Sequence, residues 1–170
     1  MLVVHAEGTP GQQGEAIGRS VRDRRFELSN VAKRVLLEEG GITEAEARAK
    51  VGALLDSLSV EAPEALGELQ GIARGADWEL TDCAVYNNWN YLIEPRAAPQ
   101  ACTARLALGS ATRTGQPLLA KNKDYRYAFG AHLHGLNWAK SADGYDFVTY
   151  GVIGWVGCDN GVNERGSPSS

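Results

Sequence analysis

Cysteine is scarce in this 170-residue sequence, which contains it only as Cys83, Cys102 and Cys158. An odd, widely spaced set of this kind is not a disulfide framework and forms no CxxC metal-binding motif. We therefore expect reduced thiols, as in a cytoplasm. Each thiol is then either a small core residue or a reactive group, and its surroundings must decide which.

The sequence also lacks long apolar runs and a large excess of one charge. No segment approaches the ~20 apolar residues that a membrane helix needs, and the first eight residues carry no basic signal-peptide pattern. The net charge of -4 gives no reason to expect nucleic acid or an anionic membrane as a partner. With 44% hydrophobic and 22% charged residues, the composition is typical of a soluble globular protein.

Residues 1–101 have a mainly helical pattern. The expected helices cover residues 14–39, 43–59, 62–75 and 80–92, and the expected strand covers residues 2–4. Gly40 and Gly41 are expected to end the first helix, because glycine tolerates a left-handed cap. Thr43 and Glu46 have the spacing of a capping box, which predicts the start of the second helix.

Residues 102–170 have the pattern of a sheet instead. The expected strands cover residues 103–108, 117–120, 133–139, 145–150 and 152–156, and the first two form a hairpin. The two prolines between residues 94 and 100 predict an exposed loop before the first of these strands. Charge changes at the same boundary, from a net -6 over residues 1–101 to +2 over residues 102–170. Cys102 is therefore the first residue of the second part.

A cysteine at the start of a strand after a loop has a specific chemical use. If the chain is cut before Cys102, that residue gains a free α-amine with a pKa of about 8, which is lower than that of lysine. Such an amine can act as a base towards the neighbouring thiol, as in N-terminal-nucleophile hydrolases. The alternative is that Cys102 is a small buried core residue, and the spacing alone favours this alternative over a nucleophile.

Other polar and thiol residues give weaker signals. Asp124 lies where the returning hairpin strand ends, so it is either a carboxylate that holds the new ammonium or an ordinary turn residue. His132 and His134 share one face of a strand, but no third ligand is evident and we expect no metal site. Cys83 and Cys158 are expected to be structural thiols.

A polar run lies within the last expected helix. Asn87, Asn88 and Asn90 flank Trp89, which is unusual for a helix. Such a run either lines a pocket or contributes to packing, and an aromatic stripe at helical spacing is more often packing.

Five segments in order resemble the acyl-coenzyme A:6-aminopenicillanic acid acyltransferase family, a group of self-processing N-terminal-nucleophile enzymes. The segments are Gly8-Thr9-Pro10 with the start of the first helix, residues 62–76 with Gly71-Ile72-Ala73-Arg74-Gly75-Ala76, Cys102-Thr103-Ala104, residues 119–125 and residues 150–157. The match extends over essentially the whole chain. It is stronger than any single motif, because the order agrees as well as the residues.

The resemblance implies an α+β fold. A helical segment would be followed by the first antiparallel strands of an αββα N-terminal-nucleophile hydrolase sandwich. Residues 1–101 would be the helical pro-segment and residues 102–170 the start of the β-rich catalytic part, which remain together as a heterodimer after cleavage. Family members are longer, so the chain resembles a C-terminally truncated member. The family's downstream Asn and Arg have no counterpart in it.

The resemblance also implies roles for individual residues. The chain would cleave itself between Ala101 and Cys102, and Cys102 would then be the nucleophile. Asp124 would support the site, and Asn122 would be a local structural partner. The implied substrate is a small amide or acyl-thioester, with no cofactor. Hydrolysis and acyl transfer, as in the penicillin acyltransferases, both stay open.

Three residues depart from the family pattern. Ala101 replaces the usual glycine, while Lys121 and Lys123 replace the motif's glutamine and tryptophan. If cleavage needs a strained backbone at residue 101, alanine adds about 1 kcal/mol or more to its cost. The two lysines change the charge of the expected pocket.

A second hypothesis belongs to another class of protein. The chain would be a small, non-catalytic α+β binding module, in which aromatic residues line a ligand groove. Those residues are Trp89, Tyr91, Trp138 and Trp155. Under this hypothesis Cys102 reacts with thiol reagents no faster than the other two cysteines.

Overall fold

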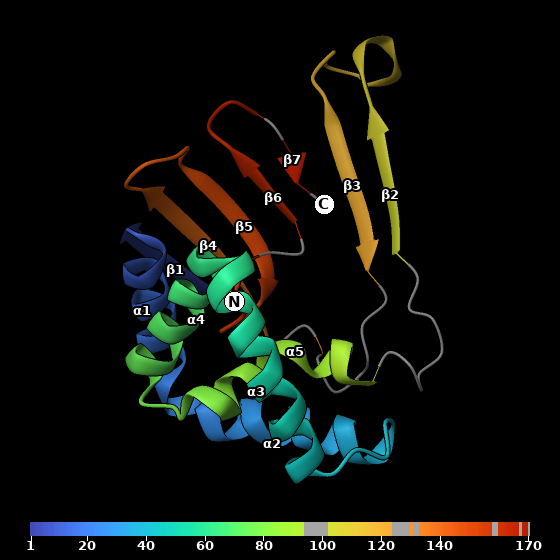
Figure 1. The fold of residues 1–170 in the computed structure, drawn as a ribbon. Coiled ribbons are helices and arrows are strands. Elements are labelled where there is room, and N and C mark those ends of the chain that lie inside the picture. Colours follow the sequence, from blue (N-terminus) through green and yellow to red (C-terminus); the bar gives the residue numbers. More distant parts are fainter. Residues whose placement is uncertain (94–101, 124–129, 131–132, 158–159, 167, 170) are drawn as a thin grey trace.

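The computed structural model describes residues 1–93, 102–123, 130, 133–157, 160–166 and 168–169 (Figure 1). The helices are α1 (Pro10–Val21), α2 (Arg25–Glu38), α3 (Glu44–Glu61), α4 (Pro63–Ala76) and α5 (Leu80–Ile93). The strands are β1 (Leu2–Gly8), β2 (Cys102–Ala107), β3 (Leu118–Lys123), β4 (His134–Ser141), β5 (Phe147–Val152), β6 (Asn160–Asn163) and β7 (Pro168–Ser169). The α+β class is confirmed. Among the described helices, none has the length and apolar character needed to span a membrane.

The first expected helix is divided in two. Thr9 caps α1 through a capping box with Gln12, so α1 begins at Pro10, earlier than expected. A short 3-10 turn, Arg22–Arg24, then separates α1 from α2. The prediction of one continuous helix was wrong because the chain changes direction here, with α1 packing on α4 and α2 on α5. Val21 and Leu28, on either side of the turn, are both fully buried.

The expected helix boundaries around residue 40 are confirmed. α2 ends at Glu38, and Gly41 has a φ of +57°, which glycine adopts without steric cost. Thr43 accepts a hydrogen bond from the Glu46 backbone N–H, and the Glu46 side chain returns to the Thr43 backbone. This capping box begins α3.

α1 and α4 pack so closely that only glycine fits between them. A Cβ on Gly14 or Gly18 would overlap backbone atoms of α4, and one on Gly71 or Gly75 would overlap backbone atoms of α1. The sequence predicted that the helix ends at Gly75, but Gly75 lies within α4 and contacts α1. α4 ends at Ala76, and Asp77 caps it in the left-handed conformation.

The larger sheet is mixed rather than wholly antiparallel. Its strand order is β1-β4-β5-β6-β7, in which β1 runs parallel to β4 and the other neighbours are antiparallel. The expected strand at residues 2–4 is thus the start of a seven-residue edge strand. The αββα sandwich and the boundary between residues 101 and 102 remain predictions.

Residues 153–156 were expected to form a strand, and that prediction was wrong. β5 ends at Val152, and Gly154 has a φ of +76°, which is outside the strand region. α5 holds the resulting turn: the Tyr86 hydroxyl donates to the Ile153 carbonyl at 2.7 Å. The Asn87 side chain donates to the Gly154 carbonyl at 3.2 Å and accepts from the Val156 N–H at 2.8 Å.

The expected hairpin is confirmed. β2 and β3 pair in register from Cys102 opposite Lys123 to Ala107 opposite Leu118. They form a separate two-stranded sheet that extends away from the larger one (Figure 1). Most side chains of β2 are exposed, with Leu106 at 58%.

Candidate functional site

Cys102 lies exposed at the start of β2. Its Cα pairs with that of Lys123, and Thr103 pairs with Asn122, whose side chain is also exposed. The hairpin therefore returns the end of β3 to the residue that begins β2, as the sequence predicted. Asp124 follows Lys123 directly, but Asp124 and Ala101 lie outside the described residues.

Cys83 has the opposite environment. It is fully buried in α5, and burial raises the pKa of its thiol to about 12. A thiol with that pKa holds its proton at neutral pH and is a poor nucleophile. The prediction that Cys83 is a core residue is confirmed, whereas Cys158 lies outside the described residues.

His134 also has a structural environment. Its side chain is buried, its ring stacks on Tyr150 with centroids 5.5 Å apart, and its Nδ1 lies 3.2 Å from the Gly130 carbonyl oxygen. His132 lies outside the described residues. Within the part of the chain that the structure describes, no three His, Cys, Asp or Glu side chains gather as metal ligands.

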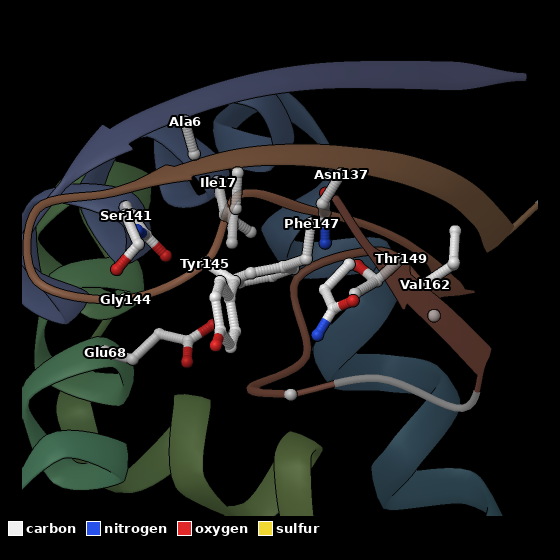
Figure 2. A pocket seen from close by; sticks show the side chains of 15 residues that line it. Ala6, Ile17, Glu68, Asn137, Ser141, Gly144, Tyr145, Phe147, Thr149 and Val162 are labelled. Atoms are coloured by element: carbon white, nitrogen blue, oxygen red, sulfur yellow. The ribbon is translucent and has the colours of Figure 1, made fainter. Parts of the chain in front are cut away.

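A cavity of about 480 Å³ lies between the larger sheet and helices α1 and α4 (Figure 2). Alternate residues of a strand face the same side of a sheet, and the residues on one face of β4, β5 and β6 form the floor of the cavity. They are Asn137, Ala139, Ser141, Phe147, Thr149, Gly161 and Asn163. Gln13 and Ile17 come from α1, and Glu68 from α4.

Glu68 is the carboxylate of this cavity, and its side chain extends from α4 towards Tyr145 and the sheet (Figure 2). Burial raises the pKa of the Glu68 carboxyl to about 7, although a hydrogen bond from the Gly157 N–H opposes the shift. Removal from water disfavours the charged form, and one backbone donor does not compensate for it. Glu68 therefore exchanges a proton near neutral pH.

Glu68 is not among the residues that the sequence pattern marked as functional, although a signal was present. Glu68 precedes Ile72 by four residues and Gly75 by seven, which places it on the helix stripe that packs against α1. A glutamate on the buried stripe of a helix is uncommon and marks a special environment.

A series of contacts connects α5 to this carboxylate. Asn87 holds the turn at residues 153–156 through Gly154 and Val156, and the next residue, Gly157, donates its N–H to Glu68. Gln13, another lining residue, donates from its side-chain amide to the Gly8 carbonyl at 2.9 Å and to the Lys140 carbonyl at 3.4 Å. Asn87 does not line the cavity, but it positions a residue that does.

The four aromatic residues of the binding-module hypothesis lie in different surroundings. Trp89 is buried in the core, with its ring 6.3 Å from that of Trp155. Trp138 is exposed on β4 and stacks on His5, and Tyr91 is exposed on α5. None of the four is among the residues that line the 480 Å³ cavity. The hypothesis that they share one groove is therefore not supported.

Comparison with protein-family models finds no match to the chain, and comparison with curated protein sequences finds no significant match.

Proposed function

We propose that the chain is a self-cleaving cysteine N-terminal-nucleophile enzyme that acts on small amides or acyl-thioesters. The observation that carries this proposal is the position of Cys102. Its thiol is exposed at the first residue of β2, and the end of β3 lies opposite. A nucleophile at a strand start leaves room for a substrate beside it, while the paired strand fixes its backbone. The buried Cys83 has no such access.

Self-cleavage begins with an acyl shift. The Cys102 sulfur attacks the carbonyl carbon of Ala101, the peptide bond breaks, and the released nitrogen takes the thiol proton. The resulting thioester is hydrolysed by water, which leaves a carboxylate on Ala101 and restores the thiol. Cys102 now carries a free α-amine, whose pKa of about 8 suits a base near neutral pH.

Catalysis repeats the same chemistry on a substrate. The α-amine accepts the thiol proton, and the thiolate attacks the substrate carbonyl carbon. The leaving amine or thiol takes that proton and departs, so the acyl group remains on Cys102 as a thioester. Water then completes hydrolysis, or a second amine accepts the acyl group in a transfer reaction.

Two residues of β3 and its continuation have supporting roles in this proposal. Asp124 follows the register partner of Cys102 and is proposed to stabilise the new α-ammonium by charge. Asn122 pairs with Thr103 in the hairpin and is proposed to hold the local backbone. Both proposals concern positioning, and Cys102 alone forms the covalent bond.

Mass spectrometry of the purified 170-residue chain tests the proposal. We expect two fragments that meet between Ala101 and Cys102, whose masses together exceed that of the chain by one water. Cys102→Ala should leave the chain uncut. Cys158→Ser, which removes another thiol of the same part of the chain, should still be cut before Cys102. Full-length protein without cleavage in the unsubstituted chain contradicts the proposal.

Thiol labelling alone does not distinguish this proposal from the binding-module hypothesis. Cys102 is exposed and Cys83 is buried, so a reagent reaches Cys102 first whether or not it is a nucleophile. Cleavage before Cys102 is the distinguishing result, since a binding module has no reason to break its own chain.

A further inference from the structure

The cavity between α1, α4 and the larger sheet has the composition of a small-molecule site. Its volume of about 480 Å³ lies in the range of ligand pockets. Ile17 and Phe147 supply apolar surface, and Asn137, Thr149 and Asn163 supply hydrogen-bonding groups from the sheet. Cys102 is not among the lining residues. The cavity is therefore separate from the proposed nucleophile.

The charged group of the described cavity lining is acidic. Among the lining residues that the structure describes, Glu68 carries the single carboxylate, and none is a lysine, arginine or histidine. Within the described residues, Glu68 accepts a hydrogen bond from Gly157 and makes no ion pair. Arg165 lies nearby along the sheet, with its guanidinium 5.5 Å from the Tyr145 ring centre, but it does not line the cavity.

We propose that this cavity binds a small organic cation, a primary amine with an apolar body. The ammonium group would lie against the Glu68 carboxylate, and the apolar body would lie against Ile17 and Phe147. A half-buried carboxylate without a counter-charge is unfavourable, and a bound ammonium removes that cost. Anionic ligands are disfavoured for the same reason, because they would meet a like charge.

The protonation of Glu68 fits this assignment. Because burial raises the pKa of its carboxyl to about 7, the group changes charge readily near neutral pH. An arriving ammonium favours the charged form and displaces the proton to solvent. The Gly157 hydrogen bond then holds the carboxylate in place, so the site is positioned by the turn that Asn87 supports.

Titration with phenethylamine, followed by NMR of the whole chain, tests the proposal. The neutral comparison ligand is 2-phenylethanol, which keeps the ring and replaces the ammonium with a hydroxyl. We expect phenethylamine to bind saturably and at least about tenfold more tightly than 2-phenylethanol. Shifts should centre on Ile17 and Phe147.

Two variants of α4 sharpen the test. Glu68→Gln keeps a side-chain oxygen that can accept from Gly157, and it should weaken phenethylamine about tenfold or more while leaving 2-phenylethanol unchanged. Glu64→Gln, one helical turn away and exposed, should change neither. Equal affinity of amine and alcohol for the unsubstituted chain, or no saturable amine binding, overturns the proposal even if Glu68→Gln fails to fold.

The proposal is independent of catalysis at Cys102. Cys102→Ala should bind phenethylamine as tightly as the unsubstituted chain, since Cys102 is not a lining residue. A loss of amine binding in Cys102→Ala overturns the assignment to this cavity. Loss of self-cleavage in the same variant concerns only the proposed function.

Discussion

The β2–β3 hairpin and the Glu68 cavity are two candidate sites built in opposite ways. The hairpin consists of two strands that are neighbours in the chain, and its thiol, Cys102, is exposed. The cavity is assembled from β1, α1, α4, β4, β5 and β6, and its carboxylate is half-buried. The first site depends on a local motif and the second on tertiary packing, so different substitutions should damage each of them.

The largest expected effect comes from the interface between α1 and α4. A Cβ at Gly71 would overlap the backbone of α1 at Gly11, so Gly71→Ala must force the helices apart. We expect it to lower the free energy of unfolding by about 3 kcal/mol or more, as severe overpacking does, and to abolish amine binding. Urea denaturation measures the first effect and NMR titration the second.

Gly67 on the same helix provides the matched control. A Cβ there meets nothing within 4 Å, so Gly67→Ala should stabilise α4 by up to about 1 kcal/mol, because alanine loses less backbone entropy. Equal destabilisation by the two substitutions would contradict close packing as the cause.

A smaller effect is expected from Asn87. Asn87→Ala removes two hydrogen bonds to the turn at residues 153–156 and leaves the Gly154 carbonyl and the Val156 N–H without that partner. We expect a loss of about 1–3 kcal/mol in the free energy of unfolding, together with weaker phenethylamine binding. Chemical denaturation and NMR titration report the two effects.

Asn88 is the control for this substitution. Within the described part of the chain, its side chain donates only to the Ala84 carbonyl one turn earlier in the same helix, at 2.8 Å. Asn88→Ala should therefore leave amine affinity unchanged. If both variants weaken binding equally, the turn does not position Glu68.

The smallest expected effect is the pH dependence of stability. The Glu68 carboxyl has a pKa of about 7 in the folded chain, above its ordinary value of 4.5, so the folded state binds its proton more tightly. The contribution of Glu68 to the free energy of unfolding is therefore fully present below about pH 4.5 and is lost as the pH rises through about 7. We expect this loss to be about 1–2 kcal/mol, because partial exposure to solvent reduces it.

Denaturation of the Glu68→Gln variant at two pH values isolates this effect. The variant should match the unsubstituted chain near pH 4 and exceed it in stability near pH 8. Among the described lining residues, the other titratable side chain is that of Tyr145, which both chains share. A variant that is less stable at pH 8 would mean that the charged carboxylate contributes favourably.

The elements that could be predicted from the sequence are those set by local interactions. The capping box at Thr43, the helices α3 to α5 and the β2–β3 hairpin depend on residues close in the chain, and they are confirmed. The buried position of Cys83 followed in the same way from its place in a helix rich in aromatic residues. Such patterns are specified within one or two turns or strands.

Features that depend on distant contacts were missed. The parallel pairing of β1 with β4 joins residues 2–8 to residues 135–141, and nothing local indicates the partner or its direction. Residues 153–156 were expected to continue a strand, but hydrogen bonds from α5 hold them in a turn. The cavity could not be predicted because its walls come from six separate elements.

The central claim is that Cys102 and Glu68 serve two separate sites, and native mass spectrometry of two variants in the presence of phenethylamine tests it directly. A single spectrum reports both the covalent mass of the chain and the bound amine. We predict that Cys102→Ala remains uncut and binds the amine, whereas Glu68→Gln is cut before Cys102 and does not bind it. The claim is contradicted if Cys102→Ala is cut. It is also contradicted if both variants lose cleavage, or if both lose amine binding.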